Sequence, residues 1–481
     1  MNDSAPLSPR KSRLKALSER LASARQRWRA RSAYFHAEDT RYLKFLVPEG
    51  ARVLDLGCAT GDTLAALRPS HGVGVDFSAA MVATARRLHP ALHFFEADIE
   101  NSDELADIEG PFDFILMADT IGSLDDCQAT FLKLHRLCAP HTRVIVAYYA
   151  YFWEPILRVA ELCGRKMPAE PQNVLSTDDI SALLDLAGFQ VLRREWRQLL
   201  PKNLAGVGPL INRYLATLPG LRRFCLRNYV VARSLRARAP VPRSASVIIP
   251  CRNERGNIAP AVARMPRFCE DIEIIFVEGH SADETHQEAE RVRDLHAGVW
   301  DIKVMRQDGV GKADAVFKGF DAARGEVLMI LDADLTVAPE DLGKFFDAIA
   351  TGQGEYVQGS RLVYPIEQDA MRFLNLLANW CFSKLFTWLL NQRITDTLCG
   401  TKVLRRDDYA TLKANRAYFG DFDPFGDFDL IFGAAKMNLK TLEIPIRYAA
   451  RRYGETQISR FRHGLMLLRM VVFAYRRLKA F

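Results

Sequence analysis

A chain of 481 residues that is 49% hydrophobic and 26% charged has the composition of a soluble globular protein with two or three domains. Its nine cysteines lie singly with no CxxC pair, which argues against a zinc ribbon and against a secreted disulfide framework. The net charge of +7 is concentrated at the ends: residues 1–50 carry +6 and residues 447–481 carry +8. Because no zinc-finger, helix-turn-helix or RNA-recognition pattern accompanies these basic ends, nucleic acid is not an expected partner.

The first half of the chain reads as a basic helical segment followed by an α/β domain. Residues 1–34 form the basic segment, which is rich in alanine. The predicted domain covers residues 35–232, where apolar strands alternate with helical patterns. This alternation predicts a parallel, doubly wound sheet. The segments in chain order are VLDL, DTLAAL, HGVGVD, SAAMVATARRL, LHFFEAD, FDFILMAD and TRVIVAYY, closed by SALLDLAGFQVLRREW.

Acidic residues close three successive strands of this predicted sheet. Asp55 lies with Gly57 and Gly61 in the turn after the first strand, where glycines let backbone N–H groups approach a ligand. Asp76 closes the second strand, where a carboxylate can accept both hydroxyls of a ribose, and Asp98 closes the third. The carboxyl ends of neighbouring parallel strands meet at one edge of a sheet. The three acidic residues therefore predict a single crevice.

The ordered set VLDLGCATG, VGVD and EADIE resembles the class I S-adenosylmethionine-dependent methyltransferases. The resemblance covers about residues 35–200 and implies a Rossmann-like sheet that binds S-adenosylmethionine next to Asp55. It implies that Gly57 and Gly61 pack near the methionine part of the cofactor. It also implies that Asp76 holds the ribose and that Asp98 lies near the adenine.

The chain departs from this family at Ala59, where the family often has glycine. A methyl group is small, so cofactor binding is still expected. After FILMAD, where a methyltransferase often places catalytic groups, the chain offers Asp119, Thr120 and Ser123 without an NPPY-type signature. These residues do not indicate whether nitrogen, oxygen or carbon is methylated.

A connector separates this half from a second α/β series. Residues 233–245, RSLRARAPVPRSA, are poor in large apolar side chains and contain two prolines, which is typical of an exposed linker. The strands SVIIP, IEIIFVE and GEVLMILDAD follow, with helical patterns between them. They predict a second doubly wound sheet within residues 246–457. The turn sequences of the two halves differ, which favours gene fusion over duplication.

Acidic residues also follow the strands of the second series. Glu254 follows the first strand and Glu278 the second, while Asp332 and Asp334 end LMILDAD. Alone, such a DxD is more often a helix cap than a ligand set. A hard divalent cation, however, takes oxygen ligands and typically uses one or two carboxylates together with substrate phosphates. The ordered series favours a site for Mg²⁺ or Mn²⁺.

An ordered set of motifs in this half resembles the inverting family 2 glycosyltransferases, particularly the dolichol-phosphate mannose synthase-like branch. In chain order the motifs are VIIPxxNE, an acidic strand end with SxDxT, GKxxA and LDAD. The resemblance covers about residues 244–457. It implies a GT-A fold, a nucleotide-diphosphate sugar donor, and a metal ion held between Asp332, Asp334 and the diphosphate. It places Glu254 near the nucleotide.

The remaining residues match this family less evenly. Glu278 stands where relatives have a nucleobase or ribose contact, but Gly279 replaces a second acid, which leaves the nucleotide preference open. Lys312 either offers its charge to a phosphate or stays solvated. The segment RRYGET, with Arg451 and Arg452, resembles the basic segment that closes over the diphosphate and neutralises the leaving nucleotide.

The segments DTLCGTKVLRRDDY and FGDFDLIFGAAKMNLKTLEIPIRY resemble the acceptor side of the same family. Asp427 and Asp429 bracket Phe428, so they share a face on a strand and diverge by about 200° on a helix. One of them is the candidate catalytic carboxylate. A sugar hydroxyl needs such a base to attack, whereas an acceptor phosphate is already an anion.

Two apolar stretches bear on localisation. Residues 371–390 carry a narrow polar stripe, and residues 458–481 read as a basic amphipathic helix. Both suit a peripheral enzyme with a lipid acceptor, and both equally suit helices packed on the sheet. No signal-peptide pattern begins the chain, so the expected location is the cytoplasm, as a peripheral protein at the inner face of the cell membrane.

The motifs together predict a fusion of two enzymes. The second half is expected to transfer a sugar, with inversion, from a nucleotide-diphosphate donor to a polyprenyl phosphate or another cell-envelope glycan acceptor. The first half is expected to transfer a methyl group from S-adenosylmethionine to an unknown acceptor. In the alternative, only the glycosyltransferase is active and the first half is a degenerate scaffold or a cofactor-binding module. A non-catalytic sensor is disfavoured by the intact DAD and RRYGET motifs.

Overall fold

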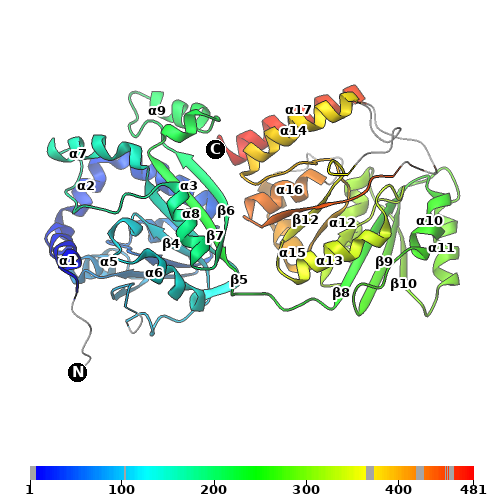
Figure 1. Cartoon of the computed structure of the whole chain (residues 1–481), viewed down its shortest axis with the longest axis horizontal. Coiled ribbons are helices and arrows are strands. Elements are labelled where there is room, and N and C mark those ends of the chain that lie inside the picture. Colours follow the sequence, from blue (N-terminus) through cyan, green and yellow to red (C-terminus); the bar gives the residue numbers. More distant parts are fainter. Residues whose placement is uncertain are drawn as a thin grey trace. The chain divides into compact units, whose positions relative to one another are not determined.

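The computed structural model describes residues 7–101, 104–364, 373–418, 427–449, 451, 453 and 460–481. Within them the chain divides into two compact units, one that ends at Ala239 and one that begins at Pro240 (Figure 1). Each unit is built on its own seven-stranded sheet with helices against it. The predicted class of two doubly wound α/β domains is confirmed.

The sheet of the first unit has the strand order β3-β2-β1-β4-β5-β7-β6. Strands β1 to β5 run parallel to one another, but β7 runs antiparallel to both β5 and β6. The sheet is therefore mixed, whereas the sequence predicted a parallel one. The strands are β1 (Arg52–Leu56), β2 (His71–Asp76), β3 (His93–Glu96), β4 (Phe112–Ala118), β5 (Cys138–Tyr149), β6 (Phe189–Arg197) and β7 (Arg227–Ser234).

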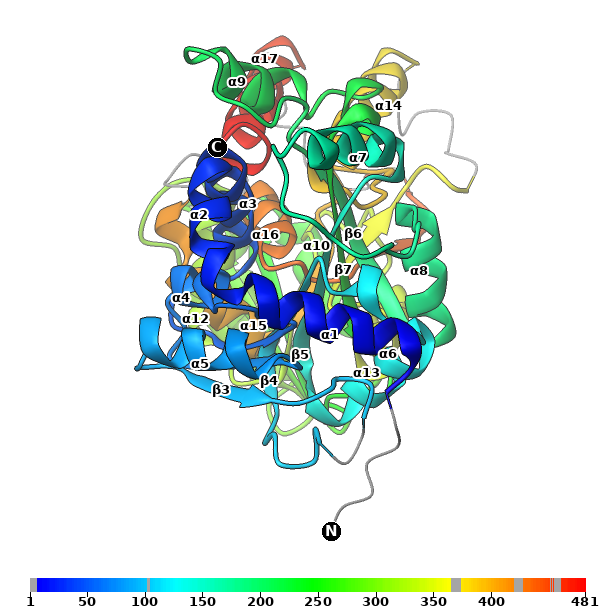
Figure 2. The ribbon, with the colours of Figure 1, turned by 90° about the vertical axis from the view of Figure 1, so that its left-hand side faces the viewer.

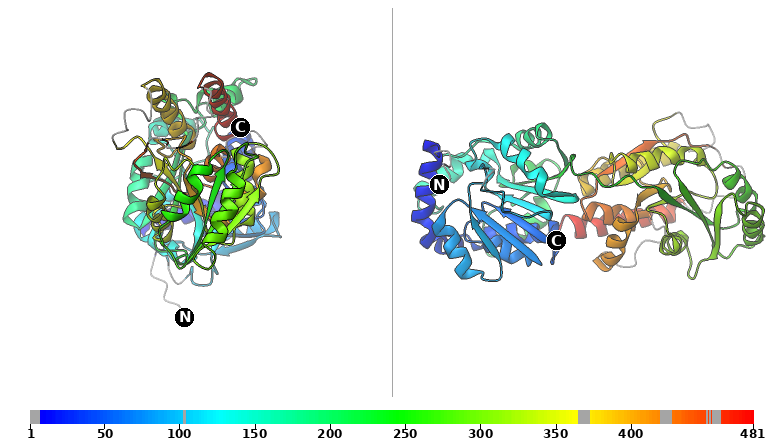
Figure 3. Two further views of the ribbon diagram at one scale, coloured as in Figure 1. Left: turned by 90° about the vertical axis from the view of Figure 1, so that its right-hand side faces the viewer. Right: turned by 90° about the horizontal axis from the view of Figure 1, so that it is seen from below.

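Helices lie on both faces of this sheet (Figure 3). On one face, Phe131 of α6 and Ile180 of α8 join a buried core with strand residues such as Leu54 and Val146. Helices α4 and α5 pack beside β2, and α3 packs against α4. The helices are α1 (Pro9–Leu21), α2 (Arg25–Arg31), α3 (Ala33–Leu46), α4 (Asp62–Leu67), α5 (Ala79–Leu88), α6 (Cys127–Leu134), α7 (Glu154–Leu162), α8 (Thr177–Leu186) and α9 (Val207–Leu210).

The sheet of the second unit has the order β10-β9-β8-β11-β13-β12-β14. Strand β13 runs antiparallel to β11 and β12, and the other pairs are parallel. The strand order reverses between β8 and β11, which in an open α/β sheet is where a ligand crevice forms. The strands are β8 (Ser244–Cys251), β9 (Asp271–Glu278), β10 (Asp301–Arg306), β11 (Val327–Ile330), β12 (Tyr356–Ser360), β13 (Lys402–Arg405) and β14 (Thr441–Pro445).

Alternating strand residues divide the second unit into two layers. Val247 and Phe276 share a core with α10, α11 and α13, while Ile248 faces Gly319 of α12 on the other side. On that side α15 contacts α12 and α16, and α14 packs on α16. The helices are α10 (Arg255–Ala263), α11 (Thr285–Leu295), α12 (Lys312–Ala322), α13 (Leu342–Ala350), α14 (Phe373–Leu390), α15 (Arg406–Ala414), α16 (Asp427–Lys436) and α17 (Arg460–Leu478).

The two apolar stretches noted in the sequence correspond largely to α14 and α17. In α14, Phe386 and Leu389 are fully buried, whereas Trp380 is 58% exposed, so this helix packs through one side. Trp388 of α14 stacks on Tyr475 of α17. Across the described part of the chain, no helix has both the length and the apolar character needed to span a bilayer.

Candidate functional site

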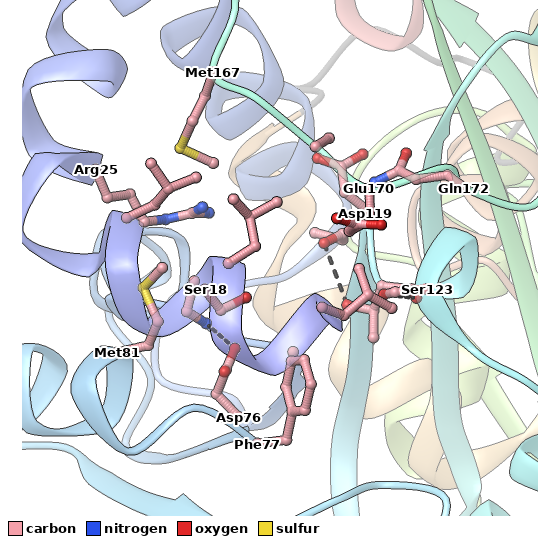
Figure 4. A pocket seen from close by; sticks show the side chains of 18 of the residues that line it. Ser18, Arg25, Asp76, Phe77, Met81, Asp119, Ser123, Met167, Glu170 and Gln172 are labelled. Atoms are coloured by element: carbon pink, nitrogen blue, oxygen red, sulfur yellow. Dashed lines mark hydrogen bonds between the residues drawn. The ribbon is translucent and has the colours of Figure 1, made fainter. Parts of the chain in front are cut away.

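The first unit contains a cavity of about 320 Å³ at the carboxyl ends of β1, β2 and β4 (Figure 4). The strand order reverses between β1 and β4, so the cavity occupies the crevice that the sequence predicted. Its volume falls within the range of ordinary ligand pockets. The strand ends contribute Gly57, Ala59, Asp76, Phe77, Asp98, Asp119 and Thr120, and α1, α2 and residues 166–172 complete the wall.

The turn after β1 brings the backbone close to this cavity. Gly57 and Gly61 adopt φ angles of +78° and +75°. A Cβ atom on Gly57 would lie 2.2 Å from Thr120 Oγ1, so only glycine fits there. Ala59 also has a positive φ, +48°, and its N–H donates to Asp76 Oδ2 over 2.9 Å. The alanine that departs from the family pattern therefore adopts a left-handed conformation that costs a non-glycine residue about 1–2 kcal/mol.

Of the predicted acidic residues in β1 and β2, Asp76 lines the cavity, whereas Asp55 does not. Asp76 accepts hydrogen bonds from the N–H groups of Ala59 and Ser78, and each of its oxygens retains a lone pair for a ligand hydroxyl. Asp55 lies behind the turn, 2% exposed, and its Oδ1 has no hydrogen-bond partner among the described residues. Burial, followed by the nearby Asp76 carboxylate, raises the pKa of Asp55 to about 7. A buried carboxyl of this kind suits a cationic ligand.

The third predicted acid, Asp98, is paired with the N-terminal helix. Lys11 of α1 forms ion pairs with Asp98 and, over 2.7 Å, with Glu100. Although burial opposes it, these two carboxylates raise the pKa of the Lys11 ammonium. Figure 2 shows α1 passing in front of the strand ends of this unit. Residues between Lys11 and Ser32 of the predicted basic segment therefore form a wall of the cavity.

Several cavity residues were not predicted from the sequence. Arg25 of α2 reaches into the cavity opposite Glu170 and Gln172, and Met167 also lines it (Figure 4). The apolar spacing of Leu14, Leu17 and Leu21, which all line the cavity, was the available signal that α1 covers something. No motif identified the segment 166–172.

The end of β4 carries a buried charge network next to the cavity. Asp119 has a φ of +65° and pairs with Arg227, whose side chain is fully buried. Arg227 Nε also donates to Asp39 Oδ1 over 3.0 Å. Burial raises the pKa of the Asp119 carboxyl above its usual value, although the nearby Arg227 cation opposes this shift. His36 lines the same cavity, and burial together with Arg29 lowers its pKa to about 4, so it is neutral at pH 7.

The residues around the first cavity fit S-adenosylmethionine. The cofactor presents an ammonium and a sulfonium cation, a carboxylate and two ribose hydroxyls. Asp55 offers an uncompensated buried carboxyl, Asp76 offers acceptors for the hydroxyls, and Arg25 offers a cation. The glycine turn leaves room for the cofactor next to the backbone.

In the second unit, the DAD turn after β11 holds two carboxylates that are each paired with a cation. Asp332 Oδ1 lies 2.6 Å from Lys312 Nζ, and Asp334 Oδ2 lies 2.9 Å from Arg451 Nη2. Although burial opposes it, Lys312 lowers the pKa of Asp332. Asp334 Oδ1 also accepts from the N–H and the hydroxyl of Thr336, which fixes the turn.

The predicted acid after β8 joins the same cluster. Glu254 Oε1 lies 3.3 Å from Arg451 Nη1, and Glu254 Oε2 accepts from Asn257 over 2.6 Å. Arg451 therefore bridges Glu254 and Asp334 across the point where the strand order reverses. Sequence reasoning placed these residues, together with Lys312, in one donor site, and the structure brings them together. Arg452 lies outside the described residues.

Gly400, from the DTLCG segment, packs directly against this cluster. A Cβ atom at this position would lie 1.8 Å from Asp332 Oδ2 and 2.6 Å from Lys312 Nζ. The segment is fixed by a buried pair, in which Arg361 Nε lies 2.6 Å from Asp396 Oδ2. Sequence reasoning assigned DTLCG to the acceptor side and gave Gly400 no role.

Glu278 is held by its own loop. It is 3% exposed, and its carboxylate accepts a hydrogen bond from the N–H of Ser281. Although burial opposes it, this bonding lowers the pKa of Glu278. Arg306 Nε lies 3.9 Å from its Oε2. The structure thus shows Glu278 shaping the loop after β9.

The candidate acceptor-side carboxylates lie on a helix. Asp427 begins α16, so Asp427 and Asp429 diverge by about 200° and cannot share a face. Asp429 is 5% exposed and pairs with Arg416, with 3.2 Å between Arg416 Nε and Asp429 Oδ2. The side chain of Asp427 lies outside the described residues.

The DAD turn fits a hard divalent cation. Mg²⁺ and Mn²⁺ are commonly held by one or two carboxylates plus substrate phosphates, and Asp332 with Asp334 supplies the two carboxylates. In the described part of the chain, no group of three or more His, Cys, Asp and Glu side chains could hold a metal on its own. The fit therefore depends on phosphate oxygens from a substrate.

Comparison with known proteins identifies both units. Residues 26–194 match the family model described as Methyltransferase domain, and residues 246–412 match the model for Glycosyl transferase family 2. The chain contains a methyltransferase domain followed by a family 2 glycosyltransferase domain. The recognition of both families from their motifs is confirmed.

Curated relatives match parts of the chain. A low-salt glycan biosynthesis hexosyltransferase of Haloferax volcanii is 26% identical over 50% of this chain and 55% of its own length. A dolichol-phosphate mannosyltransferase of Pyrococcus furiosus is 33% identical over 24% of this chain and 34% of its own length. A polyprenol monophosphomannose synthase of Mycolicibacterium smegmatis is 28% identical over 44% of this chain and 80% of its own length. The chain thus spans about half of the first relative and about a third of the second.

Solved structures also align with each domain. A possible histamine N-methyltransferase of Thermotoga maritima is 20% identical, covers 46% of this chain and 99% of its own, and gives a TM-score of 0.37. Glucosyl-3-phosphoglycerate synthase of Mycobacterium tuberculosis is 15% identical, and the alignment covers 49% of this chain and 80% of its own. Its TM-score is 0.36.

Proposed function

We propose that this chain is a bifunctional transferase. Its glycosyltransferase domain moves a sugar from a nucleotide-diphosphate donor to a polyprenyl phosphate, with Mg²⁺ or Mn²⁺ and with inversion at the anomeric carbon. Its methyltransferase domain transfers a methyl group from S-adenosylmethionine. The observation that carries the proposal is the donor cluster, in which Asp332 and Asp334 are paired with Lys312 and Arg451.

The donor cluster is suited to a diphosphate. A bound metal ion would be held by Asp332 and Asp334 and would stabilise the charge that develops on the leaving nucleotide. Lys312 and Arg451 would then pair with phosphate oxygens, since both already lie within 3 Å of the metal-site carboxylates. Glu254 holds Arg451 from the other side and keeps its guanidinium oriented.

Inversion follows from a single displacement at the anomeric carbon. The acceptor oxygen attacks from the face opposite the leaving diphosphate. A phosphate acceptor needs little deprotonation, so the buried pair of Asp429 with Arg416 is compatible with this chemistry. Asp427 remains the candidate base for a hydroxyl acceptor. The names of the mannosyltransferase relatives support a polyprenyl phosphate acceptor.

The same chemistry supports a peripheral location. A polyprenyl phosphate resides in a membrane, and its phosphate is presented at the surface. We infer that the protein works at the cytoplasmic face of the cell membrane without spanning it.

A second candidate is a glycosyltransferase whose first domain no longer transfers methyl groups. Ala59 favours this alternative, because it adopts the left-handed conformation where the family often has glycine. The open cavity, the unpartnered oxygen of Asp55 and the free acceptor capacity of Asp76 favour an active domain.

The proposal is tested by incubating the full chain with Mn²⁺, polyprenyl phosphate and a panel of radiolabelled nucleotide sugars. The expected result is a lipid-extractable sugar with inverted anomeric configuration, formed from one donor. No transfer from any donor, or retention of configuration, would contradict it. A parallel thermal-shift titration with S-adenosylmethionine tests the first domain, where no stabilisation at saturating cofactor would favour the second candidate.

A further inference from the structure

The methyltransferase domain exposes an amphipathic helix next to its cofactor cavity. No residue of α7 is buried. Ile156, Val159 and Leu162 are 50%, 59% and 88% exposed, and Phe152 just before the helix is 54% exposed. Large apolar side chains that gather on one side of a surface helix usually mark a binding face.

A second segment extends this apolar surface. Phe224 meets Phe152 edge to face, with ring centroids 5.9 Å apart, and its carbonyl accepts from Trp153 Nε1 over 2.8 Å. Many large apolar side chains of residues 204–224 are 40% exposed or more. We call the following residues the apolar face: Tyr151, Phe152, Ile156, Val159, Leu162, Leu204, Val207, Leu210, Tyr214, Leu215, Leu221 and Phe224.

The charge around the apolar face is positive on balance. Residues 151–166 contain three basic residues and two acidic ones, Glu154 and Glu161, and each of these carboxylates is paired with a basic neighbour. Residues 199–224 contain four basic residues and no acidic one. Basic side chains beside exposed apolar ones are typical of surfaces that bind anionic lipid bilayers, where apolar side chains enter the headgroup region and cations pair with phosphates. The basic residues of 199–224 are Lys202, Arg213, Arg222 and Arg223.

A second cavity, of about 360 Å³, lies beneath α7. Leu157 and Leu162 of the helix line it, together with Tyr148 and Val174. This cavity shares wall residues with the cofactor cavity, so a ligand in it would lie next to the methyl donor. The shared residues are Tyr149, Lys166, Ala169, Glu170 and Gln172.

From this arrangement we propose that the apolar face docks on an anionic lipid bilayer and that the cavity beneath α7 receives a lipid-linked methyl acceptor from it. The acceptor class rests on the proposed methyl transfer, whereas the docking does not. A bilayer, rather than a protein, is favoured because the exposed apolar side chains are accompanied by seven basic and two acidic residues over residues 151–166 and 199–224.

Docking can be measured on the full chain through Cys163, which is exposed at the C-cap of α7. An environment-sensitive fluorophore is attached there in a Cys381→Ser background, and phosphatidylcholine vesicles with or without phosphatidylglycerol are added. The emission should shift to the blue with anionic vesicles and return when salt is raised. An unchanged emission would overturn the proposal. The reciprocal label on Cys381, with Cys163→Ser, reports separately on α14.

Charge substitutions provide the second test. Val159→Glu combined with Leu162→Glu should weaken vesicle binding about ten-fold or more, because two carboxylates would enter an anionic surface. Leu186→Glu and Leu295→Glu, each on a side chain 67% exposed elsewhere, should leave binding unchanged. Retained stabilisation by S-adenosylmethionine shows that the variant is folded. Undiminished vesicle binding, or a dimer of the parent chain that the double variant dissociates, would contradict docking on lipid.

The acceptor is tested with radiolabelled S-adenosylmethionine and a lipid extract that contains polyprenyl phosphates, reconstituted in vesicles. Label should enter the organic phase with the parent chain and fall at least about five-fold with the double variant. Label transferred equally well to a water-soluble acceptor would overturn the acceptor class. Vesicle binding is measured without catalysis, so failure of methyl transfer and failure of docking are distinguishable.

Discussion

At the residue scale, the donor cluster depends on the absence of a side chain at Gly400. A Cβ atom there would lie 1.8 Å from Asp332 Oδ2, so Gly400→Ala must displace the Asp332 carboxylate and the Lys312 ammonium beside it. We expect sugar transfer to fall about 100-fold, because small misplacements of catalytic groups have effects of that size. The measurement is the rate of lipid-linked sugar formation.

Gly343→Ala is the matched control for this substitution. Its Cβ atom would meet only Phe268 Cβ at 3.4 Å, an ordinary van der Waals contact within the same domain. Its activity should equal that of the parent chain. Full activity in Gly400→Ala would show that the position of Asp332 does not matter for transfer.

Asp55 gives the methyltransferase domain a predicted pH dependence. Burial and Asp76 raise its pKa from 3.8 to about 7, so the folded domain holds a proton that the unfolded chain releases. The stability of the domain therefore falls as the pH rises from about 4 to about 7. A cationic cofactor favours the ionised carboxylate, so its affinity should rise about ten-fold between pH 6 and pH 8.

Asp55→Asn removes this titration. Calorimetry across that pH range should show a flat affinity for S-adenosylmethionine in the variant and proton release on binding in the parent chain. The parent and the variant having the same pH profile would exclude Asp55 as the source of the dependence.

At the scale of elements, α1 is attached to the methyltransferase domain by a partly buried ion-pair cluster. Lys11→Met would leave Asp98 and Glu100 without their cation. We expect a loss of about 1–3 kcal/mol in the free energy of unfolding, since the cost of leaving buried polar groups unpaired is of that size. Faster proteolysis of residues 7–24 should accompany it, and urea unfolding measures the stability.

Lys15→Met tests whether this effect is specific. Lys15 lies on the same helix, but its pair with Glu96 is exposed, so its loss should change stability by less than about 0.5 kcal/mol. Equal effects of the two substitutions would mean that the buried position of Lys11 is unimportant.

Most strands could be predicted from the sequence because their apolar runs end in turns that carry acidic residues. The antiparallel strands β7 and β13 were not among the predicted strands. An antiparallel strand buried on both faces has the same apolar run as a parallel one, so direction follows only from how the chain connects in space. The role of α1 was missed because the sequence showed only a basic, alanine-rich segment, whereas Lys11 is buried between two carboxylates.

The residues of the candidate sites also divide into those that the sequence could predict and those that it could not. Asp332, Asp334 and Glu254 were predictable because each follows a strand, and strand ends meet at one edge of the sheet. Arg451 was predicted only through family resemblance, since it lies almost 200 residues away in sequence from Glu254. Spacing alone could not separate a helix from a strand at Asp427 and Asp429. Gly400 carried no signal, because its importance arises from a contact with Asp332.

At the scale of the whole molecule, the chain joins two domains with separate cores and separate sites. We propose that the two domains unfold independently around the connector between β7 and β8, residues 235–243, which is shorter than the predicted linker because the predicted ends belong to these strands. Differential scanning calorimetry should show two transitions. Saturating S-adenosylmethionine should raise one of them by about 5–10 °C, and nucleotide with Mn²⁺ should raise the other.

A single transition that responds to both ligands would contradict this independence. The Asp55→Asn and Asp332→Asn variants serve as controls, because each should reduce the response to one ligand and leave the response to the other unchanged. The assignment of each transition to a domain then follows from the variant that alters it.

The most direct test of a metal-assisted donor site is the rate of nucleotide release from the accepted nucleotide sugar, measured with increasing Mn²⁺ for the parent chain and for Asp332→Asn. The parent should depend on the metal, and the variant should release nucleotide at least about 100-fold more slowly at every Mn²⁺ concentration. Asp294→Asn, on an exposed pair with Arg293, should behave like the parent. Release by Asp332→Asn at the parent's rate and with the parent's metal dependence would contradict the assignment of this carboxylate.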